Sequence, residues 1–363
     1  MRTRSYDRDE AADALRAAGW TDGLPVTVPT RERVEHMLDA AAVAPDDVVG
    51  GVAELGVALT ADIAAANAVM AGCPPDTFPI VLAAIGAALD PGFHLPVVTT
   101  STGGAAIGVL VSGPMAARVG MEGGHNALGG VNHANATIGR AVHLAARNLL
   151  GIGSGRVDGT SLGHPARISL CFTDTQPPAP WGSLSESLGY DAGDTTVTVF
   201  AADTPRQVAN HLSEEPDDIL ATLASALASP WHYPVGKGGT QAVVVLGPEH
   251  AASLVRAGWT RADTGAHLRD HSRVSADQLA AAGQRLEQGS QHDMVPDDDG
   301  LFVTIDSPED VLVATAGGSG AGWSCVIPSW APTLHSRRAT RRVRPPGEGL
   351  PPCGPDGCTV EWT

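Results

Sequence analysis

The sequence predicts an α/β protein of repeated strand–Pro–helix units, and it allows two pseudo-duplicated halves around mixed sheets. Three observations lead to this expectation. The chain has 363 residues, of which 43% are hydrophobic and 17% charged, so it can bury a large core. Short apolar runs bounded by glycine, typical of buried strands, alternate with longer alanine-rich segments of helical character. The order strand, proline, helix recurs along the chain.

The N-terminal part is expected to be mostly helical, with helices over residues 8–19, 31–42, 59–70 and 77–89. Thr30 can cap the second helix, because its hydroxyl oxygen can accept a hydrogen bond from the first turn. The third helix ends at Gly72-Cys73-Pro74-Pro75. Further on, residues 97–100 and 106–112 are expected to be strands. Residues 134–150 form a clear helix pattern, with Asn132 or Asn135 available as its N-cap.

Four segments are expected to follow the strand–Pro–helix plan: residues 109–120, 197–212, 243–259 and 302–318. Proline suits the first helical turn, where its missing N–H costs nothing and its φ is already helical. LRAAGWTDG (15–23) is also similar to LVRAGWTRAD (254–263). We therefore predict an N-terminal α/β half (1–175), a C-terminal α/β half (183–343) and a Pro/Gly/Cys-rich flexible tail (344–363), with the division near the proline-rich residues 175–182.

Charge and composition limit the function classes. The formal net charge of −17 argues against a nucleic-acid partner, which would require a basic face. No apolar run approaches the roughly 20 residues of a membrane span, and the first residues lack the apolar core of a signal peptide. We expect a cytoplasmic protein with no membrane partner. Its five cysteines are widely spread, so reduced thiols are expected rather than a disulfide framework.

The first candidate site is the Gly/Asn/His stretch over residues 121–140. Its glycines allow close approach of a ligand to the backbone, and a helix starts within it. The side chains proposed to bind an anionic substrate are Asn132, Asn135, Thr137 and Arg140. His125 and His133 could move protons or bind a metal, although the spacing fixes no third ligand. The alternative is a structural loop whose asparagines cap the helix.

Further candidates lie elsewhere in the chain. Cys73 sits just before a helix start, a position that lowers a thiol pKa and favours a nucleophilic thiolate, although a small buried residue is the alternative. Glycines after an apolar run at 316–325 suggest an anion-binding loop through Gly317, Gly318 and Ser319, with Ser324 or Cys325 as a nucleophile; a tight structural loop is the alternative. Lys237, the only lysine, lies among glycines and is a candidate to bind a substrate phosphate or carboxylate, with a solvent-exposed hairpin as the alternative. Cys353 and Cys358 in the tail could form a strained disulfide, hold a soft metal or act as a mobile thiol pair; incidental thiols are the alternative.

The chain resembles a poorly characterised bacterial family with these blocks in the same order: WTDGLPVTVPT (20–30), NAVMAGCPPDTFPIVLAA (67–84), NHANATIGRA (132–141), LGPEHAASLVRAGW (246–259) and AGGSG (316–320). The resemblance covers nearly the full length. It implies an association with small proteins that carry a selenocysteine- or cysteine-Gly-Ser-Cys (UGSC-type) motif, and hence thiol or redox chemistry. That motif is absent here; Gly322-Trp-Ser-Cys325 is only faintly similar. The resemblance favours Cys73 and the 121–140 loop as functional.

Three function hypotheses follow. The first is an enzyme that acts on a small anionic metabolite through cysteine-dependent thiol, redox or lyase chemistry, with Cys73 as the thiol and His133 or His125 as the proton carrier. The second is a metal-dependent lyase or hydratase that uses His125 and His133, with Glu122 or the tail cysteines as candidates for a further ligand. The third is a non-catalytic ligand-binding subunit of a small redox protein. The sequence identifies no cofactor, and the small-residue helices over 59–89 would suit a homo-oligomer contact.

Overall fold

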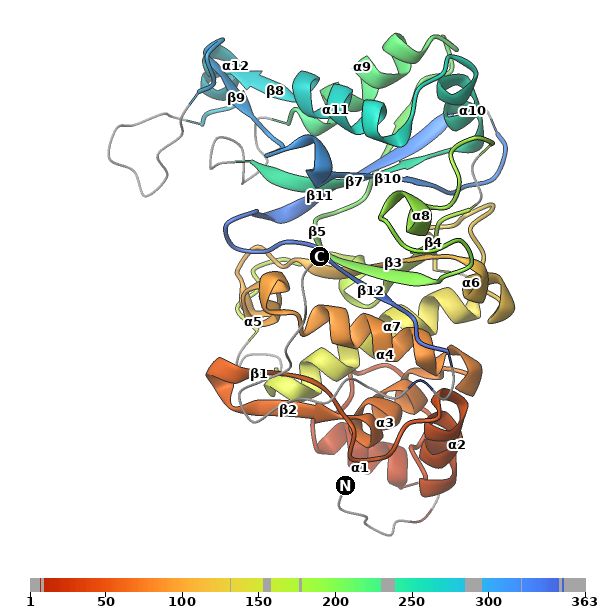
Figure 1. The fold of residues 1–363 in the computed structure, drawn as a ribbon. Helices are drawn as coiled ribbons and strands as arrows, with labels where there is room; N and C mark the ends of the chain where they lie inside the picture. The colour runs from red at the N-terminus through yellow and green to blue at the C-terminus, as the bar shows by residue number, and fades with distance from the viewer. Residues whose placement is uncertain are drawn as a thin grey trace.

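The α/β class is confirmed: two stacked central sheets lie between helices, and the N-terminal helices are stacked more than one deep on their side (Figure 1). The structure is a computed structural model. It describes residues 7, 10–130, 132–152, 158–175, 178–229, 239–284, 296–320, 322–345 and 348.

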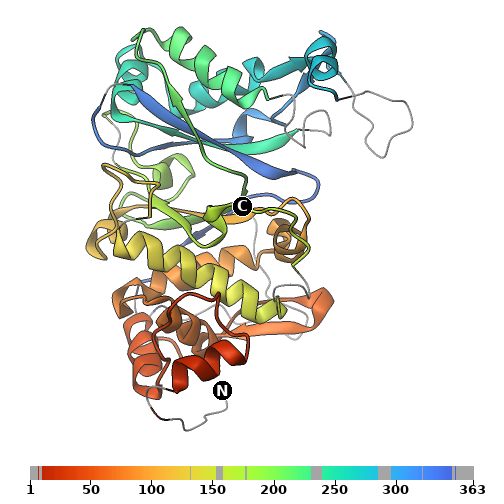
Figure 2. The same cartoon turned by 180° about the vertical axis from the view of Figure 1, so that it is seen from behind.

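The first helical layer comes from the N-terminal part of the chain. Thr30 caps its second helix as predicted, with Oγ1 accepting a hydrogen bond from Arg33 N (3.4 Å). Figure 2 shows the longest helix, α7, lying along one face of the first sheet. The helices of this part are α1 (Ala11–Ala17), α2 (Arg31–Ala41), α3 (Ala61–Ala71), α4 (Phe78–Ala88), α5 (Leu95–Thr100), α6 (Pro114–Arg118) and α7 (His133–Leu150). Beside them, β1 (Val48–Val52) pairs with β2 (Val57–Thr60).

The two central sheets have the same strand topology. In the first, the order is β4 (Leu170–Thr173), β3 (Ala106–Ser112), β5 (Thr196–Ala202) and β12 (Ala339–Arg342). In the second, it is β10 (Val311–Thr315), β7 (Thr240–Leu246), β11 (Trp323–Pro332) and β6 (Arg206–Ala209). In each sheet the first two strands are parallel and the next two join antiparallel. One pairing, Ser329 with Ala202, links the sheets.

The outermost strands are exchanged between the two sheets. β6 follows β5 in the chain but pairs with β11 of the second sheet. β12 follows β11 but returns to pair with β5 of the first sheet. The outer strand of each sheet is therefore the one that follows, in the chain, a strand of the other sheet.

Alternating side chains give each sheet two apolar faces. In β3, Ile107, Val109 and Val111 pack against the first helical layer, whereas Leu110 faces the second sheet. In β7, Val244 and Leu246 contact the second helical layer, and Val243 and Val245 face inward. This period of two is the one expected of strands. Between the sheets, a Cβ on Gly108 would lie 2.4 Å from the Phe200 ring, so this ring needs a glycine opposite it.

The second helical layer consists of α9 (Pro216–Leu227), α10 (Pro248–Arg256) and α11 (Arg261–His271). The remaining pieces are small. They are α8 (Leu184–Ser187), α12 (Ala276–Ala281), the pair β8 (Arg273–Ser275) and β9 (Leu301–Val303), and short 3-10 turns at Ala53–Leu55, Pro75–Thr77, Pro91–Phe93, Pro165–Arg167 and Pro308–Asp310.

Three secondary-structure predictions were wrong. Residues 97–100 belong to α5, where the hydroxyls of Thr99 and Thr100 bond back to the carbonyls of Leu95 and Pro96 (2.8 and 2.7 Å). Pro205 precedes β6 rather than a helix, because those residues pair with β11. Pro308 starts only one 3-10 turn before the buried strand β10. The strand–Gly–Pro–helix units at β3–α6 and β7–α10 are confirmed.

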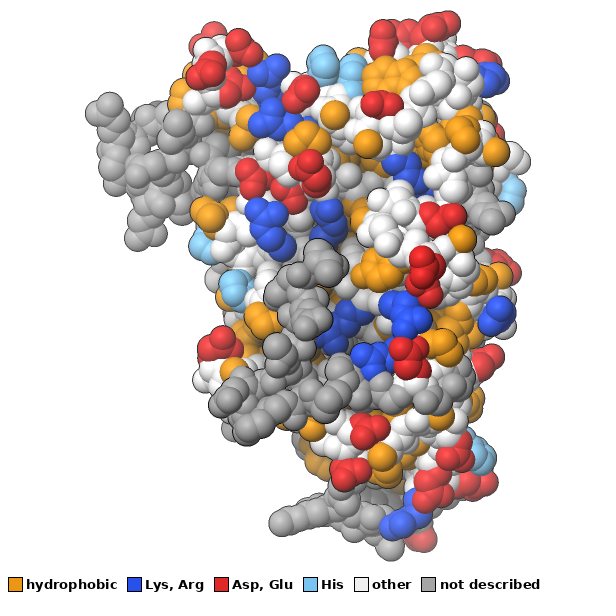
Figure 3. Space-filling model, viewed as in Figure 1, with side chains coloured by type: hydrophobic (Ala, Val, Ile, Leu, Met, Phe, Trp, Pro, Cys, Tyr) orange, Lys and Arg blue, Asp and Glu red, His pale blue; other side chains and the backbone are white. Residues whose placement is uncertain are grey.

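Acidic and basic side chains are interspersed over the described residues visible in Figure 3. In the parts of the chain that the structure describes, no single helix has both the length and the apolar character for a membrane span; one bent pair, Pro75–Ala88 with Pro91–Thr100, meets both criteria jointly.

A buried carboxylate, Asp174, ties the two sheets together where β4 and β10 end. Its Oδ1 accepts hydrogen bonds from the backbone N (2.8 Å) and hydroxyl (3.1 Å) of Thr315, and its Oδ2 accepts one from Leu184 N (3.0 Å). Arg261 lies 3.5 Å from Oδ2, and the two side chains are only 8% and 2% exposed. Burial raises the pKa of Asp174, and the charge of Arg261 opposes that shift.

Replacing Asp174 by Ala should lower the free energy of unfolding by about 3–5 kcal/mol, because Arg261 would keep a buried charge without its carboxylate. Urea denaturation followed by circular dichroism measures this loss. Glu214→Ala is the matched control, since the Arg256–Glu214 pair is 65% and 85% exposed and should contribute at most about 1 kcal/mol. Equal losses in the two variants would contradict the role given to Asp174.

His143 links α7 to the start of β3. Its Nε2 accepts a hydrogen bond from Ile107 N (3.1 Å), so its Nδ1 carries the proton and donates to Gly139 O (3.0 Å). Burial lowers the pKa of His143 from 6.5 to about 4. The imidazole is thus held neutral in the folded protein, whereas in the unfolded chain it takes up a proton below pH 6.5.

The folded-state pKa of His143 is depressed, so its contribution to stability is complete above pH 6.5 and is lost as the pH falls toward 4. Between pH 7.5 and pH 5 we expect a loss of roughly 2 kcal/mol from this residue. Urea denaturation of wild type and His143→Gln across this range tests it. The amide oxygen of glutamine can still accept the Ile107 N–H but cannot titrate; an unchanged pH slope in the variant would show that other groups cause it.

Candidate functional site

The two glycine-rich loops predicted to bind substrate contact each other. Gly317 N donates a hydrogen bond to Gly123 O (2.7 Å). The exposed His125 packs directly on the second loop, since a Cβ on Gly318 would lie 1.9 Å from its Nδ1. One loop follows α6 in the first half and the other follows β10 in the second. A surface made by both halves therefore contains His125, Gly317, Gly318 and the exposed Ser319.

The polar side chains at the start of α7 are used within their own loop. Asn132 caps the helix by accepting from Asn135 N (3.0 Å), and it donates to Gly120 O (2.9 Å). Asn135 bonds the backbone N and O of Glu122 (3.2 and 2.8 Å), and Thr137 Oγ1 donates to His133 O (2.8 Å). These contacts agree with the structural alternative. A ligand would have to replace them.

Arg140 holds a carboxylate, but the carboxylate belongs to the chain itself. Its Nε and Nη2 donate to the two oxygens of Asp22, each at 2.7 Å. Burial acts to raise the pKa of Asp22, yet the net shift is downward because of the hydrogen bond and charge of Arg140. The paired fork geometry is the strong form of this contact. Arg140 is therefore engaged by Asp22, and a substrate anion would have to share or replace this contact.

Cys73 lies beside α7, with Sγ donating to Thr137 O at 3.2 Å. The structure thus places it close to the 121–140 segment. However, the thiol is 6% exposed within the apolar core, and burial raises its pKa from 9.0 to about 12. The expectation of a lowered pKa was wrong, because loss of solvation exceeds any benefit from the next helix start.

The remaining predicted residues do not complete a site. His133 is exposed at the first position of α7. Within the described ranges, no three His, Cys, Asp or Glu side chains converge as metal ligands, so the metal hypothesis finds no cluster there. Lys237, Cys353 and Cys358 lie outside the described residues.

A serine–histidine pair lies directly behind the 316–322 loop. His250 Nε2 is 3.1 Å from Asn210 O, and a carbonyl oxygen can only accept, so Nε2 carries the proton. His250 Nδ1 is then the acceptor for the hydroxyl of Ser324, at 2.7 Å. Burial lowers the pKa of His250 below its ordinary value, which keeps the imidazole neutral. The serine hydroxyl therefore points its proton at a neutral, oriented base.

The glycine-rich loop wraps around this pair. Gly320 N donates to Glu249 Oε1 (2.8 Å), and Gly247 N lies 3.3 Å from Ser324 Oγ. Gly322, at φ +67°, has no room for a side chain, because a Cβ would lie 2.5 Å from Asn210 O and 3.2 Å from His250 Nε2. The site lies where the parallel strands β7 and β10 end, the usual location of sites in α/β sheets.

Sequence reasoning had named Ser324 as a nucleophile candidate but had assigned His250 no role. A usable signal was present: Gly247-Pro248-Glu249-His250 follows a strand and opens a helix, the same position as the glycine-rich loop after β10. What the sequence lacked was the pairing of β7 with β11, which brings residue 324 opposite residue 246.

Compared with known proteins, the chain matches no protein-family model and no curated protein. The resemblance to the family associated with UGSC-type proteins therefore stays a prediction.

Native Cys73 should react slowly with iodoacetamide. At pH 8, a shift of the pKa from 9.0 to about 12 leaves roughly 10³-fold less thiolate, and burial restricts access further. Peptide mass spectrometry after timed alkylation, with and without urea, measures the rate at each cysteine. Ser319→Cys supplies an exposed reference thiol. Native modification of Cys73 as fast as the reference would restore the thiolate hypothesis.

Proposed function

We propose that this protein is an enzyme that transfers or hydrolyses an acyl group of a small anionic metabolite, with Ser324 as nucleophile and His250 as general base. The observation that supports the proposal is the 2.7 Å contact between Ser324 Oγ and His250 Nδ1, with the second ring nitrogen anchored on Asn210 O. A nucleophile bonded to a base that is oriented by a third group is the arrangement of covalent acyl-transfer sites.

Ser324, His250 and one water molecule account for every proton and bond in the reaction. Ser324 Oγ attacks the acyl carbon while its proton passes to His250 Nδ1, and the protonated imidazole then delivers that proton to the leaving group. Water, activated by the same imidazole, releases the acyl group and restores the serine. Asn210 O stabilises the imidazolium formed in between, because it already accepts from Nε2.

A serine mechanism needs less rearrangement than the cysteine mechanism predicted from the sequence. Cys73 would have to ionise in an apolar core, against a pKa of about 12. Ser324 needs no prior ionisation, since its proton moves to a neutral base during the attack. The cost lies in access: Ser324 is 6% exposed and His250 3% exposed. A substrate can reach the pair only if the neighbouring glycine-rich loop moves. Its glycines give the backbone the conformational freedom for such a movement.

The substrate would lie over the exposed part of that loop. Gly318 and Ser319 present backbone there, and His125 from the other half borders it. The exposed imidazole of His125 lies against Gly318. A ring N–H of this imidazole is suited to donate a hydrogen bond to an anionic group of the substrate.

A fluorophosphonate probe, which reacts with activated serines, should label the wild-type protein at Ser324. We expect Ser324→Ala to abolish labelling and His250→Gln to slow it at least about 100-fold, because glutamine can still hydrogen-bond but cannot accept the proton. Intact-protein and peptide mass spectrometry measure the adduct and its position.

Ser187→Ala is the matched control, because it removes an exposed serine hydroxyl on α8, outside the proposed substrate surface, and should leave labelling unchanged. Thermal unfolding of each variant shows whether it folds. No adduct on folded wild-type protein between pH 6 and pH 9, or an adduct that persists in Ser324→Ala, would falsify the proposal.

A further inference from the structure

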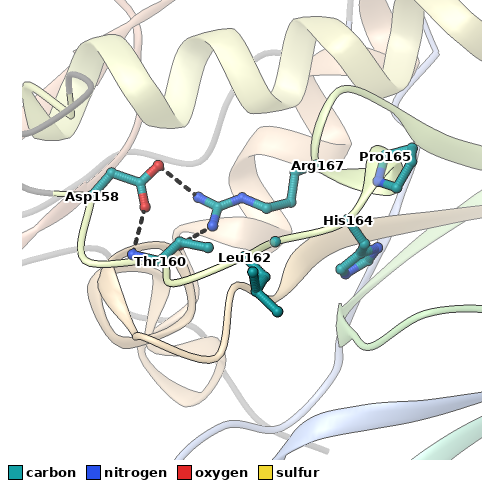
Figure 4. A pocket seen from close by; sticks show the side chains of 7 residues that line it. Asp158, Thr160, Leu162, His164, Pro165 and Arg167 are labelled. Atoms are coloured by element: carbon teal, nitrogen blue, oxygen red, sulfur yellow. Dashed lines mark hydrogen bonds and ion pairs between the residues drawn. The ribbon is translucent and has the colours of Figure 1, made fainter.

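An open pocket of about 470 Å³ lies at the edge of the first sheet opposite to the Ser324 site (Figure 4). It is formed by the segment that leads into β4, and its lining includes Asp158, Thr160, Leu162, His164, Pro165 and Arg167. The glycine-rich loops, in contrast, meet where β4 and β10 end. A ligand here would occupy a site separate from the proposed catalytic pair.

The floor of the pocket is fixed by the loop before β3. Thr160 Oγ1 donates to Ser101 O (3.2 Å), and Ser161 N donates to Thr102 O (3.0 Å). Gly104, at φ +74°, allows this approach, since a Cβ there would lie 2.5 Å from the Thr160 methyl. The pocket is therefore attached to the ends of two paired strands.

The lining contains one cation and one anion. Arg167 Nη2 donates to Asp158 Oδ2 (3.1 Å), and Nη1 contacts Thr160 Oγ1. The two charged side chains are 21% and 27% exposed, so both reach the solvent of the pocket. Burial acts to raise the pKa of Asp158, but its hydrogen bonds with Thr160 and Arg167 outweigh this and lower it. The carboxylate is therefore charged at neutral pH.

The other lining groups are neutral. Burial lowers the pKa of His164, so its imidazole is uncharged at neutral pH. Leu162, 97% exposed, and Pro165 supply apolar surface. The pocket thus combines a guanidinium, a carboxylate and an apolar rim, with no net charge. Figure 4 shows Arg167 and Asp158 directed toward each other, with His164 at the opposite side.

We infer that this pocket binds a small zwitterion of the amino-acid type, with its carboxylate on Arg167 and its ammonium on Asp158. Both groups have capacity beyond their mutual bond: a guanidinium has five N–H donors and a carboxylate about four acceptor positions. An apolar side chain of the ligand would lie against Leu162 and Pro165. The pocket, about 470 Å³ and open to solvent, has room for a molecule of this size.

Charge selects this class over simple ions. A ligand with only a carboxylate would compete with Asp158 for Arg167 and would bring a second negative charge next to Asp158, in a chain of formal charge −17. A ligand with only an ammonium would meet Arg167 in the same way. A zwitterion satisfies both side chains and carries no net charge. The inference concerns a different site and is independent of the acyl-transfer proposal.

Isothermal titration calorimetry of the full-length protein with free L-amino acids, one at a time, tests this inference. The amino acid that binds most tightly is then compared with two analogues, one that lacks its amine and one that lacks its carboxylate. We expect each of these to bind at least 10-fold more weakly than the amino acid. Arg167→Gln and Asp158→Asn should each weaken the amino acid at least 10-fold.

Arg256→Gln and Glu214→Gln are the matched controls, because they remove charges from an exposed ion pair of the same kind and should leave binding unchanged. Arg167→Lys keeps the positive charge but loses the two parallel N–H donors of the guanidinium. It should bind the amino acid more weakly than wild type and more tightly than Arg167→Gln, and its melting temperature shows whether it folds. The inference is overturned if no amino acid binds at 10 mM, if the carboxylic acid alone binds as tightly, or if the folded Arg167 and Asp158 variants bind like wild type.

Discussion

The carboxylate of Asp174 is the interaction on which the arrangement of both halves depends. It stands at the end of β4 and receives donors from the end of β10, from the start of α8 and from α11. Ser112, the last residue of β3, adds its hydroxyl at 3.4 Å. Strand ends from the two sheets are thereby held at one place. The loop after α6 and the loop after β10 meet beside it, and His125 lies on Gly318.

The two halves are alike in strand order but differ in what they place at equivalent positions. After β3, Gly113 packs against Thr195, whose hydroxyl accepts from Met115 N (3.0 Å). After β7, Gly247 packs against Trp323 in the same way, and the neighbouring Ser324 meets His250. One half uses the contact to join a strand to a helix. The other half places an imidazole nitrogen, His250 Nδ1, next to the corresponding contact.

Local signals in the sequence predicted much of the fold. The caps at Thr30 and Asn132, the helix over α7 and the buried strand β3 were all predicted from residue type and periodicity. The failures involve partners far apart in sequence. Pro205 and Pro308 looked like helix starts, but the following residues are strands because β11 and β7 pair with them. Local preference is weak where a sheet offers a full set of hydrogen bonds.

The candidate site shows the same division. The sequence correctly indicated a glycine-rich loop after the strand at 311–315, yet the partners of Arg140 and Cys73 could not be predicted from it. Asp22 is 118 residues away from Arg140, and the carbonyl that contacts Cys73 is 64 residues away. The candidacy of His250 depends on the contacts of its two ring nitrogens with Ser324 and Asn210, which are 74 and 40 residues away in the chain. Residue type suggested what each group can do, and long-range packing decided what it contacts.

The exchange of outer strands also bears on how the chain folds during synthesis. Thr340 on β12 bonds Thr198 on β5 across 142 residues, so β5 has one bare edge until the ribosome has made nearly the whole chain. Bare strand edges are prone to pair with other chains. The first sheet therefore cannot be completed until β12 has been synthesised, and its open edge at β5 is exposed to pairing with other chains until then.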